Sequence, residues 1–108
     1  MPTQQWNDIK IEVETRPPRA VRGMNEFVVI ASRKRRPASE IIVSIQIMGT
    51  GKWQQAIQDG NIGVFRKSLL LKNPKEQSLL VRIRHQKKEN KGETILEYPM
   101  RQQQAIKN

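Results

Sequence analysis

Apolar and polar residues alternate along several short stretches of the chain. In residues 8–15, for example, Ile9, Ile11 and Val13 are separated by charged residues, and this period of two is typical of a strand with one buried face. Residues 25–32 carry apolar side chains at both parities, which indicates a central strand covered on both faces. The same pattern predicts further strands in residues 40–48, 63–71, 78–84 and 93–99.

Residues that break regular structure separate these stretches. Pro17 and Pro18 remove backbone donors and fix φ, which predicts a stiff loop after the first strand. The longest break in the alternation covers residues 49–63 and is rich in glycine. It predicts either an irregular segment or a short extra strand around residues 53–57.

Six or seven short strands without a long amphipathic helix favour an all-β fold. We expect an immunoglobulin-like antiparallel β-sandwich of about 6–7 strands, with a small closed barrel as the alternative architecture. Residues 9–100 are assigned to a single domain, because 108 residues suffice for one modest core. Residues 1–8 and 101–108 show no period and are expected to be disordered.

The compartment depends on what precedes the first residue. No apolar run approaches the roughly 18 to 20 residues that cross a bilayer, and residues 1–8 lack the apolar segment of a signal peptide. We expect a periplasmic or envelope-associated protein if a leader has been removed, and a cytoplasmic protein otherwise. The absence of cysteine excludes thiolate metal sites but does not distinguish these compartments.

The chain is strongly basic. It carries 20 Lys and Arg against 10 Asp and Glu, a formal net charge of +10, which attracts acidic partners. If consecutive strands run antiparallel, successive loops alternate between the two ends of the sandwich. One end should then hold Arg16, Arg19, Arg22, Lys52, Lys87, Lys88 and Lys91. The other end should hold Arg33, Lys34, Arg35, Arg36, Lys72 and Lys75.

These loop clusters are the predicted binding sites, and an acidic protein or a membrane surface is the expected partner. A nucleic-acid reader would concentrate its charge on one face and interleave exposed aromatics, but aromatic residues make up only 5% of the chain, and Phe27 and Phe65 fit the core. A cytoplasmic nucleic acid or other polyanion is the alternative partner. We interpret Arg66, Arg82 and Arg84 as an ordinary solvated sheet face.

Few residues are suited to catalysis. His85 is the only histidine, and Asp8 and Asp59 are the only aspartates. One chain therefore cannot assemble a catalytic triad or a His-rich metal site. We expect a monomeric, non-enzymatic binding module with no small-molecule substrate and no required cofactor.

A copper site is a second alternative. The same alternation of loops places Met24, Met48 and His85 at one end of the sandwich, together with Trp53. Thioether sulfur and imidazole nitrogen are ligands that suit Cu(I). On this hypothesis the protein would be a copper-handling accessory protein.

The order of short motifs also resembles a known family. Residues 23–27 read G-x-N-x-F, a P-A step follows a polar turn, and residues 59–65 read D-G-x-x-G-V-F. The residues concerned in the first two motifs are Gly23, Asn25, Phe27, Pro37 and Ala38. Over roughly residues 9–100 the chain therefore resembles the FixH and YtkA-like small sandwich domains. The resemblance implies a β-sandwich in an exported or membrane-anchored bacterial protein, some members of the family being linked with cytochrome oxidase or copper supply.

Overall fold

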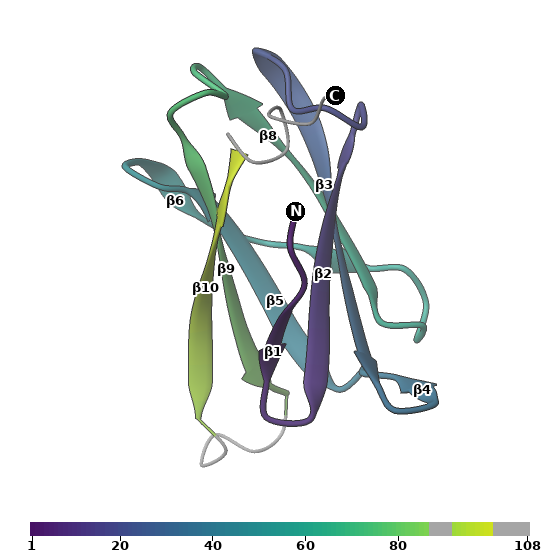
Figure 1. The fold of residues 1–108 in the computed structure, drawn as a ribbon. Helices are drawn as coiled ribbons and strands as arrows, with labels where there is room; N and C mark the ends of the chain where they lie inside the picture. The colour runs from purple at the N-terminus through teal and green to yellow at the C-terminus, as the bar shows by residue number, and fades with distance from the viewer. Residues whose placement is uncertain (87–91, 101–108) are drawn as a thin grey trace.

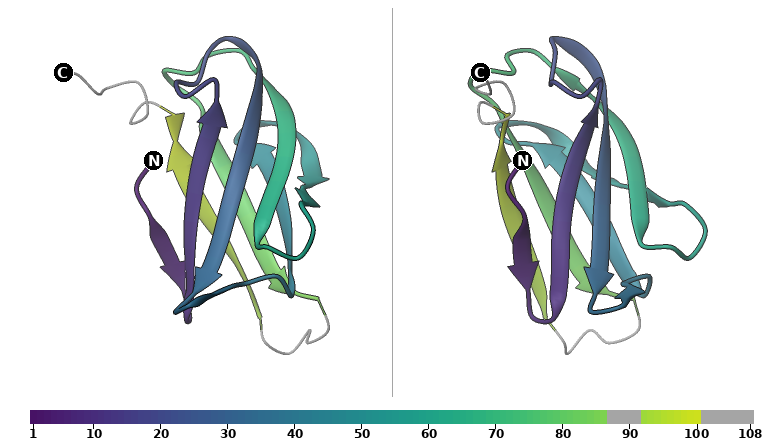
Figure 2. Two further views of the ribbon diagram at one scale, coloured as in Figure 1. Left: turned by 90° about the vertical axis from the view of Figure 1, so that its right-hand side faces the viewer. Right: turned by 45° about the vertical axis from the view of Figure 1, so that its right-hand side comes forward.

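The computed structural model describes residues 1–86 and 92–100, where two antiparallel β-sheets pack face to face (Figures 1 and 2). The strands of this part of the chain are β1 (Gln4–Trp6), β2 (Ile9–Arg16), β3 (Gly23–Arg33), β4 (Arg36–Pro37), β5 (Ile41–Ile47), β6 (Thr50–Gln55), β7 (Ile57–Gln58), β8 (Val64–Leu71), β9 (Ser78–His85) and β10 (Glu93–Pro99). The predicted all-β antiparallel sandwich is confirmed, with more strands than expected. The strands form two separate sheets, so the alternative of a closed barrel is wrong.

The first sheet has the strand order β1-β2-β3-β8-β7, with β4 paired to the end of β3, and the second has the order β10-β9-β5-β6. β3 is the central strand of the first sheet, as predicted. Phe27 and Val29 face the core, while Val28 is buried on the opposite face. Arg66 lies directly across from Val28 on β8, and its Nη1 lies 3.5 Å from Glu26 Oε1. An ion pair therefore lies beside this apolar side chain.

A buried tyrosine joins the two sheets. Tyr98 on β10 is fully buried, and its hydroxyl donates a hydrogen bond to the carbonyl oxygen of Ile11 on β2 at 3.3 Å. Burial raises the pKa of the Tyr98 phenol because the charged phenolate is poorly solvated there. The bond ties one edge of the second sheet to the first sheet.

The N-terminal segment corrects one prediction. Residues 1–8 were expected to be disordered, yet Gln4–Trp6 form β1 and pair with β2. The Gln4 side chain donates to the Glu97 carbonyl oxygen on β10 at 2.8 Å, and Trp6 packs against the core. A strand of three residues is too short to show a period in the sequence. Figure 1 shows β1 at the side of the sandwich, between β2 and β10. Residues 101–108, also predicted to be disordered, lie outside the described residues.

The glycine-rich break between β5 and β8 forms an extra traversal of the sandwich. β6 runs back along β5 in the second sheet, and β7 then pairs with β8 in the first sheet. The prediction of an extra strand in this region is confirmed. Because of this additional traversal, each of the later strands β8, β9 and β10 begins at the end of the sandwich opposite to the one predicted.

The two ends are therefore composed differently from the prediction. The end at the top of Figure 1, which we call the Arg22 end, carries the β2–β3, β5–β6 and β8–β9 connections. Lys72 and Lys75 belong to this end, because Leu71 pairs with Gly23. The opposite end, which we call the Arg35 end, carries the β1–β2 turn, the β3–β4 hairpin, the end of β9 and the start of β10. The assignment of Lys72 and Lys75 to the Arg33–Arg36 cluster is wrong.

Candidate binding surfaces

Arg33 is part of the scaffold of the Arg35 end. Its Nε lies 3.0 Å from Asp8 Oδ2, its Nη1 lies 2.7 Å from the Glu40 carboxylate, and its side chain is only 10% exposed. The hydrogen bond from Arg33 lowers the pKa of Glu40. Arg33 therefore links the β1–β2 turn, β3 and the start of β5, and it does not contribute to an open basic patch.

The rest of the β3–β4 hairpin is exposed. Arg33 pairs with Arg36 across the hairpin, and Lys34 and Arg35 form its two-residue turn. Arg35 has a φ of 70°, a left-handed conformation that is uncommon outside glycine. Lys34, Arg35 and Arg36 thus present three positive charges at one corner of this end. Lys87, Lys88 and Lys91 lie outside the described residues.

The Arg22 end combines basic and apolar side chains. Met24 and Leu70 lie directly opposite each other on the outer face of the first sheet and are 60% and 54% exposed. Val21 is also exposed in the adjoining loop. The exposed basic residues of this end are Arg16, Arg19, Arg22, Lys72 and Lys75. Lys52 lies on β6, the strand that starts at this end.

Hydrogen bonds hold the β2–β3 loop of this end in place. The Asn25 amide accepts from the Val21 backbone N–H at 2.9 Å, and donates to the Val21 carbonyl oxygen at 2.7 Å and the Gly23 carbonyl oxygen at 3.0 Å. The Thr15 hydroxyl donates to the Pro18 carbonyl oxygen at 3.0 Å. The predicted stiff loop therefore has buried side chains, Asn25 and Thr15, that fix its shape.

The proposed copper ligands are not brought together. The Met48 backbone N–H donates to the Ser78 carbonyl oxygen, which places Met48 beside the first residue of β9. His85 is the last residue of β9, about 23 Å away at the rise of an extended strand, and its ring contacts Trp6 at a centroid distance of 5.4 Å. Met24 lies on the other sheet. In residues 1–86 and 92–100, moreover, no three His, Asp or Glu side chains gather as a metal site would require.

A further surface was not predicted as a site. On the outer face of the second sheet, the guanidinium carbon of Arg82 lies 4.7 Å from the centre of the Trp53 ring. This contact depends on the position of β6 beside β5, and the irregular sequence around Trp53 does not indicate that pairing. Arg82 and Arg84 were interpreted from the sequence only as a solvated stripe.

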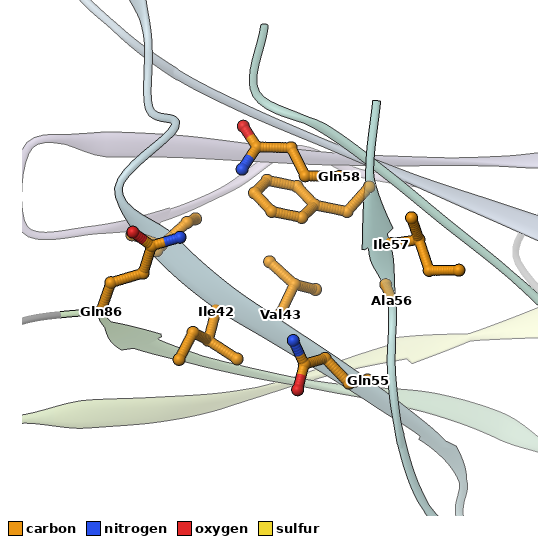
Figure 3. Close-up of a pocket in the computed structure, with 9 residues that line it drawn as sticks. Ile42, Val43, Gln55, Ala56, Ile57, Gln58 and Gln86 are labelled. Atoms are coloured by element: carbon orange, nitrogen blue, oxygen red, sulfur yellow. The ribbon is translucent and has the colours of Figure 1, made fainter. Parts of the chain in front are cut away.

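A cleft of about 280 Å³ lies where the chain crosses from β6 to β7 (Figure 3). Its apolar lining includes Val43, Ala56 and Phe65, and the polar lining residues are the glutamines Gln55, Gln58 and Gln86. Gln58 is used by the scaffold, since it donates to the Ser39 carbonyl oxygen and accepts from the Gly63 N–H. No charged side chain is among the lining residues, so the cleft provides no acid, base or nucleophile.

Comparison of the chain with protein-family models, with curated proteins and with solved structures finds no significant match. Its function must therefore be argued from its own surfaces. Within the described ranges, the structure contains no helix with the length and apolar character of a membrane span.

Proposed function

We propose that this protein is a non-enzymatic binding domain of the bacterial cell envelope, and that its Arg22 end docks onto an anionic membrane surface. The observation that carries this proposal is the pairing of Met24 with Leu70 on an exposed face, beside Arg22 and Lys72. Stable membrane association generally needs two signals, apolar insertion and a basic patch. Both signals occur together at this end of the sandwich. The envelope location follows from the motif resemblance of residues 9–100 to exported and membrane-anchored sandwich domains, although no family model matches the chain.

The strand register brings the two signals together. Gly23 pairs with Leu71, so Arg22 and Lys72 follow directly at the adjoining strand ends. Each Lys or Arg near an anionic bilayer contributes about 1 kcal/mol of attraction. The exposed methionine and leucine side chains add apolar area that leaves water on insertion, at about 25 cal/mol per Å². The hydrogen-bonded loop keeps these residues in position without an ordering cost at the membrane.

Vesicle sedimentation tests the proposal. We expect binding to vesicles of phosphatidylcholine with phosphatidylglycerol, and little binding to phosphatidylcholine alone. The double variant Arg22→Gln/Lys72→Gln should weaken binding about 30-fold, the loss expected for two surface charges. Met24→Ser/Leu70→Ser should weaken it about tenfold by removing the inserted apolar area. The matched control Lys34→Gln/Arg36→Gln removes the same charge at the opposite end and should have little effect.

Several outcomes would contradict the proposal. Equal losses from the control pair and from the Arg22-end pair would indicate attraction by net charge alone. Tighter binding to duplex DNA than to anionic vesicles, with a log-log salt slope of about −0.9 per neutralised phosphate, would favour the polyanion alternative. Recovery of the native protein from the bacterial cytoplasm would rule out the envelope location.

A further inference from the structure

We propose that the outer face of the second sheet is a separate binding site for an extended acidic segment of a partner protein, with Arg82 and Arg84 as the carboxylate receptors. This face is formed by β10, β9, β5 and β6. It uses none of the residues of the Arg22 end, so the inference does not rest on membrane docking.

The register places the central residues of this site in one row across the sheet. Ile95, Arg82, Ser44 and Gln55 are successive cross-strand partners on four neighbouring strands. Arg84 lies two residues further along β9, on the same face, because Val81 and Ile83 face the core. Two residues of a strand span about 7 Å. The two guanidinium groups therefore originate about 7 Å apart along one strand.

Trp53 holds the guanidinium group of Arg82 in position on this face. The guanidinium lies 4.7 Å from the centre of the indole ring, within the range of a cation–π contact. Such stacking holds the planar group while its N–H donors at the edge can still bind a carboxylate. Ser44 lies directly across from Arg82 on β5 and is 8% exposed, so its side chain belongs to the same face of the sheet.

These two arginines have no internal counter-ion in the described part of the chain. Arg16, Arg33 and Arg66 each form an ion pair with a carboxylate. For Arg82 and Arg84, by contrast, the structure shows none among residues 1–86 and 92–100.

Two acidic residues of the edge strand β10 lie on the same face. Glu93 lies across from Arg84, and Glu97 accepts a hydrogen bond from the Ser78 hydroxyl at 2.9 Å. Arg82, by contrast, has Ile95 and Ser44 as its cross-strand partners and no acidic one, so this central part of the face is complementary to a carboxylate.

The geometry favours an extended peptide over a nucleic acid. Alternate side chains of an extended chain repeat at about 7 Å, the same spacing as Arg82 and Arg84, and arginine binds a carboxylate with two parallel hydrogen bonds. Exposed Ile95 and half-buried Leu80 and Ile42 offer apolar contacts beside the charges. A nucleic acid would need open aromatic faces for base stacking, and Arg82 already covers one face of Trp53.

Two synthetic peptides of identical composition test the spacing. One alternates Glu and Thr, and the other carries all Glu residues in one block followed by all Thr residues. We expect the alternating peptide to bind at least tenfold more tightly and to shift the NMR signals of the Trp53 indole N–H and the Arg82 and Arg84 Nε–H groups. Equal affinity for the two peptides, or shifts confined to the Arg22 end, would overturn the proposal. Tighter binding of a single-stranded oligonucleotide than of the alternating peptide would overturn it as well.

Variants of the face separate this site from general charge attraction. Arg84→Gln changes an exposed residue and should weaken binding of the alternating peptide about tenfold, the loss of one charge-assisted contact. The matched control Arg36→Gln removes an exposed arginine elsewhere and should leave the affinity within twofold. Trp53→Leu should weaken binding, whereas Trp53→Phe, which keeps an aromatic ring under Arg82, should largely restore it.

The two proposals can fail independently. Arg84→Gln should leave vesicle binding unchanged, and Arg22→Gln/Lys72→Gln should leave peptide binding within twofold. A loss of both activities in either variant with an unchanged melting temperature would show that a single diffuse charge effect underlies both, and it would overturn the separate site.

Discussion

Gly63 lies at a crowded backbone junction of the first sheet. Its carbonyl oxygen accepts a hydrogen bond from the Ala31 N–H, and the Ala31 carbonyl oxygen accepts one from the Ala38 N–H. A Cβ atom built on Gly63 would lie 2.4 Å from the Ala31 oxygen. The glycine is thus required where pairing with β3 passes from β8 to β4.

Replacing Gly63 by alanine should destabilise the fold much more than the same change at Gly60. Both glycines have positive φ, 74° and 64°, but an added Cβ at Gly60 meets nothing within 4 Å. We expect Gly60→Ala to cost about 1–2 kcal/mol through backbone conformation alone, and Gly63→Ala to cost about 2–5 kcal/mol because the clash adds to that cost. Chemical denaturation of both variants measures the difference. Equal losses of stability would show that the close approach to Ala31 is relaxed without cost.

At the scale of elements, Tyr98 connects the edge strand β10 to β2 of the opposite sheet. Burial raises the pKa of its phenol above the ordinary value of about 10, so the native state holds this proton more tightly than the unfolded chain. The resulting stabilisation is complete below pH about 10 and is lost as the pH rises toward the folded-state pKa.

We therefore expect the stability of the protein to decrease at alkaline pH through Tyr98. At neutral pH, Tyr98→Phe should cost about 1 kcal/mol, the value of one hydrogen bond. Above pH about 10 the gap between the two proteins should narrow, because only the parent chain must ionise on unfolding. Tyr98 is the only tyrosine, so tyrosinate absorbance of the native protein reports this one group. Titration of the folded protein at the ordinary pKa of tyrosine would contradict the expectation.

At the scale of the whole molecule, the number of times that the chain crosses the sandwich decides which loops lie at the same end. Alternation of Ile9, Ile11 and Val13 sufficed to predict β2, because the side of a strand on which a residue lies depends only on its neighbours. The end at which Lys72 lies depends instead on how many times the preceding chain has crossed the sandwich. The β6–β7 traversal changes that number by one, which is why Lys72 joins Arg22 and His85 is carried to the opposite end.

The separation of Met24, Met48 and His85 leads to a direct expectation for copper. Stoichiometric Cu(I) is added to protein with labelled methionine methyl groups and a labelled histidine ring, and the NMR signals of the three residues should not shift as a set. The reason is that Met48 is hydrogen-bonded to Ser78 at one end of β9, whereas His85 lies at the other end. Comparison with Ag(I), a redox-inert substitute, provides the control. Concerted shifts of all three signals would show that the fold rearranges to form a copper site.

The sequence by itself determined the class of the fold, the principal strands and the position of the β2–β3 loop, because alternation, proline and glycine act through local geometry. It also determined the net charge of +10, from which an acidic partner is predicted. The tertiary structure alone decided that Arg33 is locked between Asp8 and Glu40, and that the short strand β1 closes one side of the sandwich. It also decided that Trp53 supports Arg82. Each of these contacts joins segments distant in sequence, and such contacts form only when sheet register and chain crossings bring the segments together.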